Sequence, residues 1–237
     1  MSDSRLQYFI VDAFTSRPFA GNPAAVVPLE AWPDAAWLQD VAMEMNLSET
    51  AYVVRNQGGY DLRWFTPKIE VDLCGHATLA TAKVLAHLGQ LPSGSTVEFS
   101  TRSGVLKASR DDNKFQLDFP VIPEERAAPP PGLIESLGIQ PCYVGRSKFD
   151  FLLEVESESI VRNLRPDFKA LASVKCRGVT VTARSGDPSF DFVSRFFAPA
   201  AGIDEDPVTG SAHCCLASFW STRLGKTRMT GYQASAR

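Results

Sequence analysis

The sequence predicts an α+β protein built from two similar halves, in each of which strands wrap around one buried helix. Three observations lead to this prediction. Short apolar runs typical of strands alternate with a few helical patterns. Two segments share one order of features, "RWFTP…CGHATLATAKVLAHLG" and "RFFAP…TGSAHCCLASFWSTRLG". A proline-rich stretch separates the halves, and each buried helix needs strands to cover it.

Composition sets the class of the protein before any motif is considered. The chain has 237 residues, 44% of them hydrophobic and 22% charged, which suits one large or two small globular domains. The net charge is −3 without a basic block, so neither nucleic acid nor an acidic membrane surface is an expected partner. The sequence contains no run of about 18 apolar residues, so no membrane-spanning helix is predicted. Its N-terminus lacks the apolar stretch of a secretory signal.

The cysteines indicate a reducing environment. Their number is five, an odd count, two are adjacent, and no C-x-x-C pair occurs. A disulfide framework is therefore not expected, and the cytoplasm is the predicted location.

The first half, residues 1–120, contains the expected elements in this order. Strands are predicted at 6–14 and 24–29, with Gly-Asn-Pro as the loop between them. A helix begins at Pro33 and Asp34, and a hairpin turning at Gly58-Gly59 joins strands at 51–56 and 60–65. A helix that is apolar nearly all round follows from Gly75 and ends at Gly89. Further strands are predicted at 95–100, 104–109 and 114–120.

The proline-rich stretch at 121–131 is the predicted connector, because its prolines are incompatible with a continuous helix or sheet. The second half, residues 132–237, has helical patterns at 133–137 and 160–171. Its predicted strands lie at 151–156, 178–183 and 189–197, and a last helix begins at Gly210.

The two similar segments predict an internal duplication. Pro67 and Pro199 are 132 residues apart, Gly75 and Gly210 are 135 apart, and the terminal Gly89 and Gly225 are 136 apart. The N–H groups of a helix's first turn have no partner within the helix, and the helix dipole is positive there. Helix starts at Gly75 and Gly210 that faced one cleft would together form an anion site, suited to a carboxylate.

Two single residues are candidates for the chemistry. His76 lies at a helix start, where the dipole disfavours its protonated form, and a neutral imidazole both donates and accepts a hydrogen bond. The alternative is a core histidine satisfied by the backbone. Glu49 lies where a helix gives way to an apolar strand, and apolar surroundings raise the pKa of a carboxyl so that it can act as a general acid or base. The alternative is a glutamate in a surface turn.

Acidic and thiol groups near the second helix start allow other interpretations. Asp204, Glu205 and Asp206 precede a Thr-Gly-Ser turn. One of these acids can orient a histidine, or all three can simply belong to a solvated loop. In the turn itself, Thr209 and Ser211 could hold a substrate carboxylate. Thiols and imidazoles near both helix starts are zinc ligands by type, but their spacing fits no usual zinc pattern, so no metal is predicted. No G-x-S-x-G turn is present, which argues against a serine hydrolase.

Four stretches taken in order resemble the phenazine-biosynthesis-like (PhzF-type) isomerase family: "VDAFTSRPFAGNPAAVV", "MNLSETAYV", "RWFTP…LCGHATLA" and "DEDPVTGSAH". The resemblance spans almost the whole chain. It implies a diaminopimelate-epimerase-like fold of two pseudo-symmetric halves, each a curved, mostly antiparallel sheet around a central helix, with the active site between them. It also implies a homodimer that needs no cofactor and acts on a small acidic substrate.

The same resemblance assigns roles to individual residues. Glu49 would be the acid/base that shuttles a proton, with His76 and Asp206 assisting, while Gly75, Gly210 and Ser211 would bind the substrate carboxylate together with Ser48 and Thr209. The family continues after "QASAR" with further strands, so the second half is expected to lack its last strands.

Two rival functions stay open. A racemase or epimerase of the same fold uses two opposed cysteines. Here Cys74 is close to the first position, but Val208 falls at the second, which favours the isomerase and a packing role for Cys74. The other rival is a non-catalytic protein that binds small acids.

Overall fold

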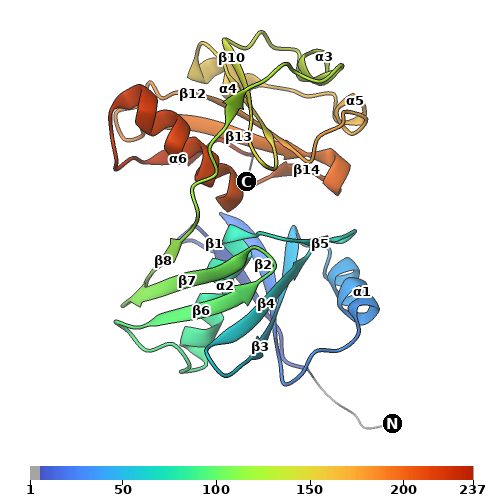
Figure 1. Cartoon of the computed structure of the whole chain (residues 1–237), viewed down its shortest axis with the longest axis vertical. Coiled ribbons are helices and arrows are strands. Elements are labelled where there is room, and N and C mark those ends of the chain that lie inside the picture. Colours follow the sequence, from blue (N-terminus) through green and yellow to red (C-terminus); the bar gives the residue numbers. More distant parts are fainter. Residues whose placement is uncertain (1–5, 237) are drawn as a thin grey trace. The chain divides into compact units, whose positions relative to one another are not determined.

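The computed structural model describes residues 6–236, so the predictions for residues 1–5 and 237 lie outside the described part. The chain divides into two compact α+β units, unit 1 (Met1–Phe119) and unit 2 (Pro120–Arg237) (Figure 1). Within the predicted connector, Glu125–Arg126 form a short strand, β9, that pairs with β10 (Tyr143–Arg146) of unit 2.

Unit 1 contains one curled sheet. Its strands run in the order β1-β2-β3-β4-β6-β7-β8, with β5 paired to β4. All neighbours are antiparallel except the parallel pairs β2·β3 and β4·β6. The strands span Phe9–Ala13, Asn22–Leu29, Glu49–Arg55, Tyr60–Phe65, Glu70–Val71, Thr96–Thr101, Gly104–Asp111 and Lys114–Asp118, from β1 to β8.

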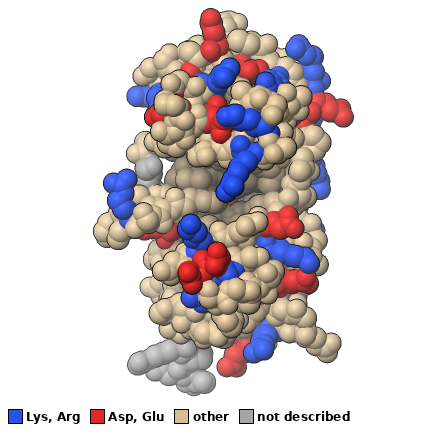
Figure 2. Space-filling view, turned by 90° about the vertical axis from the view of Figure 1, so that its left-hand side faces the viewer, with Lys and Arg blue, Asp and Glu red and all other residues tan. Residues whose placement is uncertain are grey.

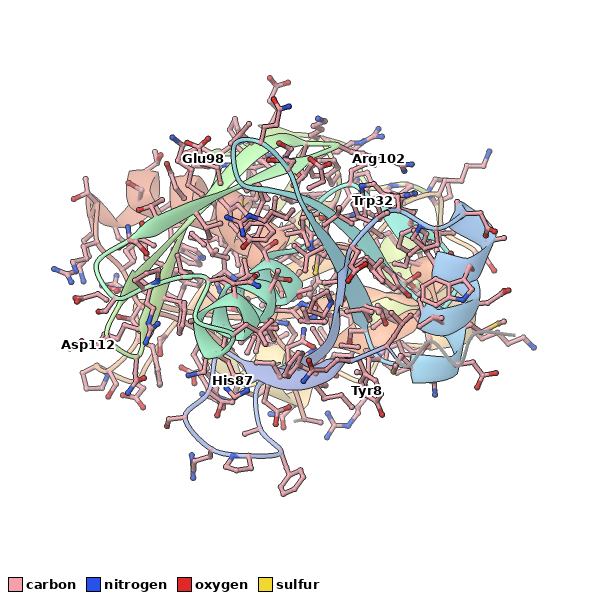
Figure 3. All side chains as sticks on the ribbon, turned by 90° about the horizontal axis from the view of Figure 1, so that it is seen from below. Tyr8, Trp32, His87, Glu98, Arg102 and Asp112 are labelled. Atoms are coloured by element: carbon pink, nitrogen blue, oxygen red, sulfur yellow. The ribbon has the colours of Figure 1, made fainter. Side chains whose placement is uncertain are left out.

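Helix α2 (Gly75–His87) is the centre of unit 1. Nine of its 13 residues are buried, as its almost continuous apolar sequence predicts. It packs against β1, β2, β3, β7 and β8. Figure 3 views unit 1 from the C-terminal end of this helix, where His87 lies, and shows the strands around it.

Helix α1 (Ala35–Met45) forms a second core cluster with the sheet. Leu38 and Ala42 pack there with Val27, Tyr52 and Phe65. The helix begins as predicted, because the Asp34 side chain accepts a hydrogen bond from Trp37 N at 2.7 Å. It ends at Asn46 in a left-handed conformation, and the chain then enters β3 at Glu49.

Unit 2 contains the second sheet, in the order β14-β13-β12-β11-β10-β9, with β15 paired to β13. Helix α6 (Gly210–Leu224) packs its buried residues against β11 and β13 in one cluster. The short helices α3, α4 and α5 contribute to a second cluster with β11, β12 and β13. The remaining elements span Leu133–Leu137, Phe151–Glu154, Glu158–Asn163, Phe168–Leu171, Val179–Arg184, Phe192–Ala198, Ile203–Asp206 and Gly231–Gln233 for α3, β11, α4, α5, β12, β13, β14 and β15.

One predicted helical pattern was wrong in its extent. The stretch 160–171 is two helices, α4 and α5, separated by four residues that include Pro166. Proline disfavours the helical conformation of the residue before it and cannot donate a backbone hydrogen bond, so the pattern cannot continue through it.

The two units share one sequence of strand pairings. In unit 1, β1 to β5 pair as antiparallel, parallel, antiparallel and antiparallel, and β6 then returns parallel to β4. In unit 2, β10 to β14 follow the same sequence, and β15 returns parallel to β13. This correspondence supports the predicted duplication. Within residues 6–236, β7 and β8 have no counterpart in unit 2.

An ion pair repeats at matching places in the two units. Arg63 on β4 binds Glu70 on β5 through two hydrogen bonds of 2.7 and 2.8 Å. Arg195 on β13 binds Glu205 on β14 through two bonds of 2.7 Å. These are the arginines of the two Arg-x-Phe-x-Pro motifs, so the motif supplies half of a strand-to-strand clamp in each unit.

The surface agrees with the balanced composition. Figure 2 shows Lys and Arg interspersed with Asp and Glu over the visible face, without a large patch of one sign. None of the helices within residues 6–236 is long and apolar enough to cross a membrane.

Candidate active site

Glu49 is brought to the core of unit 1 by the pairing of two strands. Strands β2 and β3 run parallel, with Ala24 opposite Glu49. Their first residues, Asn22 and Glu49, therefore lie at the same end of the sheet. The Glu49 side chain is 14% exposed, so the alternative of a surface-turn glutamate is not what the structure shows.

His76, the second residue of α2, meets Glu49 at this end. Its Nε2 lies 3.3 Å from Glu49 Oε2. Because the ring is neutral, this contact is a close approach of two polar atoms and not an ion pair. The other ring nitrogen, Nδ1, lies 3.2 Å from Asn22 Nδ2 and 3.5 Å from Cys74 Sγ.

The imidazole of His76 is neutral at physiological pH. Its burial lowers the pKa to about 3, and this outweighs a hydrogen bond with the Pro23 backbone, which acts in the opposite direction. The sequence predicted a neutral ring on the ground of the helix dipole, whereas the larger cause in the structure is loss of solvation. A neutral ring carries one N–H and one acceptor nitrogen.

The same three side chains could be considered as a metal site. Ligand atoms of Glu49, Cys74 and His76 all lie within 4.8 Å of one another. However, Glu49 contacts Nε2 whereas Cys74 contacts Nδ1. The lone pairs of the two ring nitrogens diverge, so one ion bound to either nitrogen would not be directed at both remaining ligands.

In unit 2, the turn before α6 holds Asp206 in a fixed network. Thr209 Oγ1 donates to Asp206 Oδ2 at 2.5 Å. Gln233 Oε1 accepts from the Thr209 backbone N at 2.8 Å, and its Nε2 donates to the Asp206 carbonyl at 2.6 Å. Asp206 and Thr209 are both buried. The side-chain amide of Gln233 therefore bonds to one backbone N–H and one backbone carbonyl of this turn, as the backbone of a neighbouring strand would.

A second group surrounds Ser211, the second residue of α6. Arg177 Nη2 donates to Ser211 Oγ at 3.3 Å. The same guanidinium binds the Asp150 carboxylate through two bonds, one of them Nε to Oδ1 at 2.8 Å. Asp150 is buried, and this pairing compensates its charge.

The predicted residues fall into two groups, one in each unit. Unit 1 brings Glu49 and His76 together, with Gly75 as the buried first residue of α2 and Ser48 half-buried before Glu49. Unit 2 brings Asp206, Thr209, Gly210 and Ser211 together at the start of α6.

Four residues of these groups were missed at the level of sequence: Asn22, Asp150, Arg177 and Gln233. Asn22 was assigned to a punctuating loop, although it opens β2. The other three come from distant parts of the chain, and no spacing in the sequence connects them to α6.

Comparison with known proteins identifies the family of the chain. The sequence profile described as "Phenazine biosynthesis-like protein" matches residues 11–237. The chain belongs to this family. An uncharacterized isomerase of Halalkalibacterium halodurans is 50% identical to it, over 97% of this chain and 87% of that protein. The phenazine biosynthesis-like relatives thus include proteins named as isomerases.

Solved structures of phenazine biosynthesis-like proteins agree with the fold. A PhzF family protein of Enterococcus faecalis superposes with a TM-score of 0.87 at 44% identity, covering 97% of this chain and 87% of that one. A predicted epimerase of Pseudomonas aeruginosa, 22% identical, matches with a TM-score of 0.70 over 99% of this chain and 84% of that chain, which shows the fold alone. The predicted α+β architecture, diaminopimelate-epimerase-like, is thereby confirmed.

Proposed function

We propose that this protein is a cofactor-independent isomerase that moves a proton on a small substrate bearing a carboxylate, with Glu49 as the acid/base. The observation that carries the proposal is the contact of Glu49 with a buried, neutral His76 at the start of α2. A carboxylate beside a neutral imidazole can take a proton from carbon and pass it on or return it.

His76 acts on Glu49 in this proposal. Because burial keeps the ring neutral, it does not neutralise the glutamate permanently as a cation would. The ring can donate a hydrogen bond to the carboxylate before the reaction. It can change its hydrogen-bonding role when Glu49 becomes protonated.

The start of α6 supplies the other roles. Asp206, held by Thr209, is the proposed orienting acid. Thr209, Gly210 and Ser211 in unit 2, and Ser48 and Gly75 in unit 1, are each proposed as substrate-binding groups, because amides at a helix N-terminus and nearby hydroxyls favour an anion such as a carboxylate. Arg177 donates a hydrogen bond to Ser211 Oγ and so orients that hydroxyl.

The rate enhancement would come from two sources. General acid–base catalysis contributes about 10²–10⁴-fold. Stabilisation of negative charge that develops on an enolate-like intermediate would have to supply much of the rest, and preorganised amide donors do this at low cost in reorganisation.

A deuterium-exchange experiment tests the proposal. The protein is incubated in deuterated buffer with a panel of small unsaturated acids and amino acids, and incorporation is measured by mass spectrometry. We expect incorporation that falls by at least about 10² in Glu49→Gln. Glu44→Gln, on the exposed face of α1, is the matched control and should retain it. Incorporation that survives in Glu49→Gln would contradict the proposal.

One observation favours a second candidate, an epimerase. Cys74 Sγ lies 3.5 Å from His76 Nδ1, close enough for a weak hydrogen bond with the ring. An epimerase using Cys74 would lose exchange at one stereocentre in Cys74→Ala while keeping it in Glu49→Gln. Val208 stands where the second thiol of such an enzyme would be, and valine has no proton to transfer, which is why we rank the isomerase first.

We also propose the cytoplasm as the location and a homodimer as the assembly. All five cysteines lie in the described residues and are free thiols, as a reducing compartment would keep them. Sedimentation velocity of the purified protein would test the dimer directly.

A further inference from the structure

The side chain of Asn22 lies against the ring nitrogen of His76 that faces away from Glu49. Asn22 is completely buried at the start of β2, and its Nδ2 lies 3.2 Å from His76 Nδ1. The preceding residue, Gly21, holds the chain in a left-handed conformation, with φ of 70°. The backbone therefore enters β2 in one defined way at Asn22.

The groups around Nδ1 offer hydrogens. The amide nitrogen of Asn22 is a donor, and the thiol of Cys74, 3.5 Å from the same ring atom, is a weak donor. A neutral imidazole has one hydrogen on its two nitrogens. If Nδ1 accepts from its neighbours, that hydrogen must be on Nε2. Nε2 is the atom 3.3 Å from Glu49 Oε2.

We propose that Asn22 is a positioning residue that selects the tautomer of His76: its amide donates to Nδ1, so the ring hydrogen stays on Nε2 and is directed to Glu49. In this state Glu49 accepts a hydrogen bond as a carboxylate, which is the form that takes a proton from a substrate. The tautomer is inferred from the contacts at Nδ1, whereas its catalytic consequence rests on the proposed function.

Pro23 provides the competing interaction. Its backbone interacts with the ring and acts to raise the pKa of His76, which a carbonyl does by accepting the ring hydrogen. If that hydrogen were on Nδ1, the tautomer would be reversed, and Nε2 could accept a hydrogen bond from Glu49 only when the glutamate is protonated. The two arrangements differ in one measurable property, the position of a single hydrogen.

Nitrogen-15 NMR of the imidazoles measures this position in the wild-type protein without substrate. The chain has only three histidines, His76, His87 and His213, and His76→Gln assigns the signals by loss of one set. We expect Nε2 of His76 to have the shift of a protonated ring nitrogen and Nδ1 that of an unprotonated one. The reverse pattern would overturn the proposal, and this outcome needs no variant at Asn22.

Replacement of Asn22 then tests its role. In Asn22→Asp a carboxylate, which only accepts, replaces the amide donor. We expect the hydrogen of His76 to move to Nδ1, or the ring to gain a second proton. Asn113→Asp, in the exposed turn between β7 and β8, adds the same charge to unit 1 and should leave the His76 signals unchanged. Unchanged His76 signals in a folded Asn22→Asp protein would show that another group selects the tautomer.

Kinetics separate this proposal from the proposed function. A reversed tautomer should lower the exchange rate by about 10²–10⁴-fold, the range for loss of an acid–base partner, with a small change in KM. If the NMR result holds but Glu49→Gln retains exchange, the proposed function fails and the tautomer assignment stands. If Glu49→Gln abolishes exchange but Nδ1 carries the hydrogen, only the role of Asn22 fails.

Discussion

Glu49 Oε2 lies 3.3 Å from His76 Nε2, with the histidine buried and the glutamate largely so. The two residues are 27 positions apart in the sequence and meet because β3 and α2 begin at the same end of unit 1. The neutrality of His76 has a consequence for stability that can be measured without a substrate.

The stability of unit 1 should fall as the pH is lowered through the range set by His76. Burial lowers the folded-state pKa to about 3, while an unfolded histidine titrates near 6.5. Below about 6.5 the unfolded state binds a proton that the folded state does not, so stability is lost as the pH falls from about 6.5 to about 3. It is unaffected by this group above that window.

Chemical denaturation at a series of pH values measures this effect. The contribution of one proton is up to about 1.4 kcal/mol per pH unit. His76→Gln should flatten the dependence between these limits, whereas His87→Gln, on the exposed end of α2, should not. An unchanged slope in His76→Gln would contradict the buried neutral ring. His213, whose pKa burial also lowers, contributes in the same direction.

Thr209→Val should disturb the Asp206 carboxylate. The threonine hydroxyl donates to Asp206 Oδ2 at 2.5 Å, and valine keeps the shape but removes the donor. Leaving a buried acceptor without that bond costs about 1–3 kcal/mol. Urea denaturation of Thr209→Val should show this loss, and Thr209→Ser should recover most of it. Equal stabilities of the valine and serine variants would mean that the hydroxyl is unimportant.

Arg195→Met should be far more damaging than the double replacement of the pair. Arg195 and Glu205 are joined by two bonds of 2.7 Å, with side chains 7% and 16% exposed. Removing the arginine leaves a partly buried carboxylate unpaired, which should lower the free energy of unfolding by about 3–5 kcal/mol. Arg195→Met combined with Glu205→Leu should be closer to the wild type.

The denaturation midpoints of the single variant Arg195→Met and of the double variant test this prediction. Lys107→Met, which removes one partner of an exposed ion pair on β7, is the control and should change little. If the single and double variants were equally destabilised, an unpaired charge would not explain the effect, and the lost packing or the lost bonds from Arg195 to the Val161 and Leu164 carbonyls would.

Gly21→Ala should destabilise unit 1 much more than Gly89→Ala. Both glycines are left-handed, with φ of 70° and 73°, but an added Cβ at Gly21 would lie 2.1 Å from the Ala13 carbonyl oxygen, while the space at Gly89 is open. Gly89→Ala should therefore cost only the conformational penalty of about 1–2 kcal/mol. Thermal denaturation of both variants compares them, and equal losses would show that the backbone relaxes at Gly21.

The fold could be predicted to a large extent because its main signals are local. Apolar runs marked most strands, and the nearly uniform apolar sequence from Gly75 identified the central helix of unit 1. The order of features in the two Arg-x-Phe-x-Pro segments predicted two similar halves, and both arginines form the same strand-to-strand ion pair. Strands β5, β9, β10, β14 and β15, each of two to four residues, were not predicted, because so short a run carries no periodicity.

By itself, the sequence determined which elements form and which residue types stand at the helix starts, because propensity, periodicity and capping act between near neighbours in the chain. Only the tertiary structure decided what each of those residues touches. The parallel pairing of β2 with β3 placed Asn22 and Glu49 at one end of the sheet, on either side of the imidazole of His76. Gln233 and Arg177 joined the start of α6 in the same way. Such contacts depend on strand register and on packing between segments that are far apart in the sequence, and no local sequence pattern encodes either.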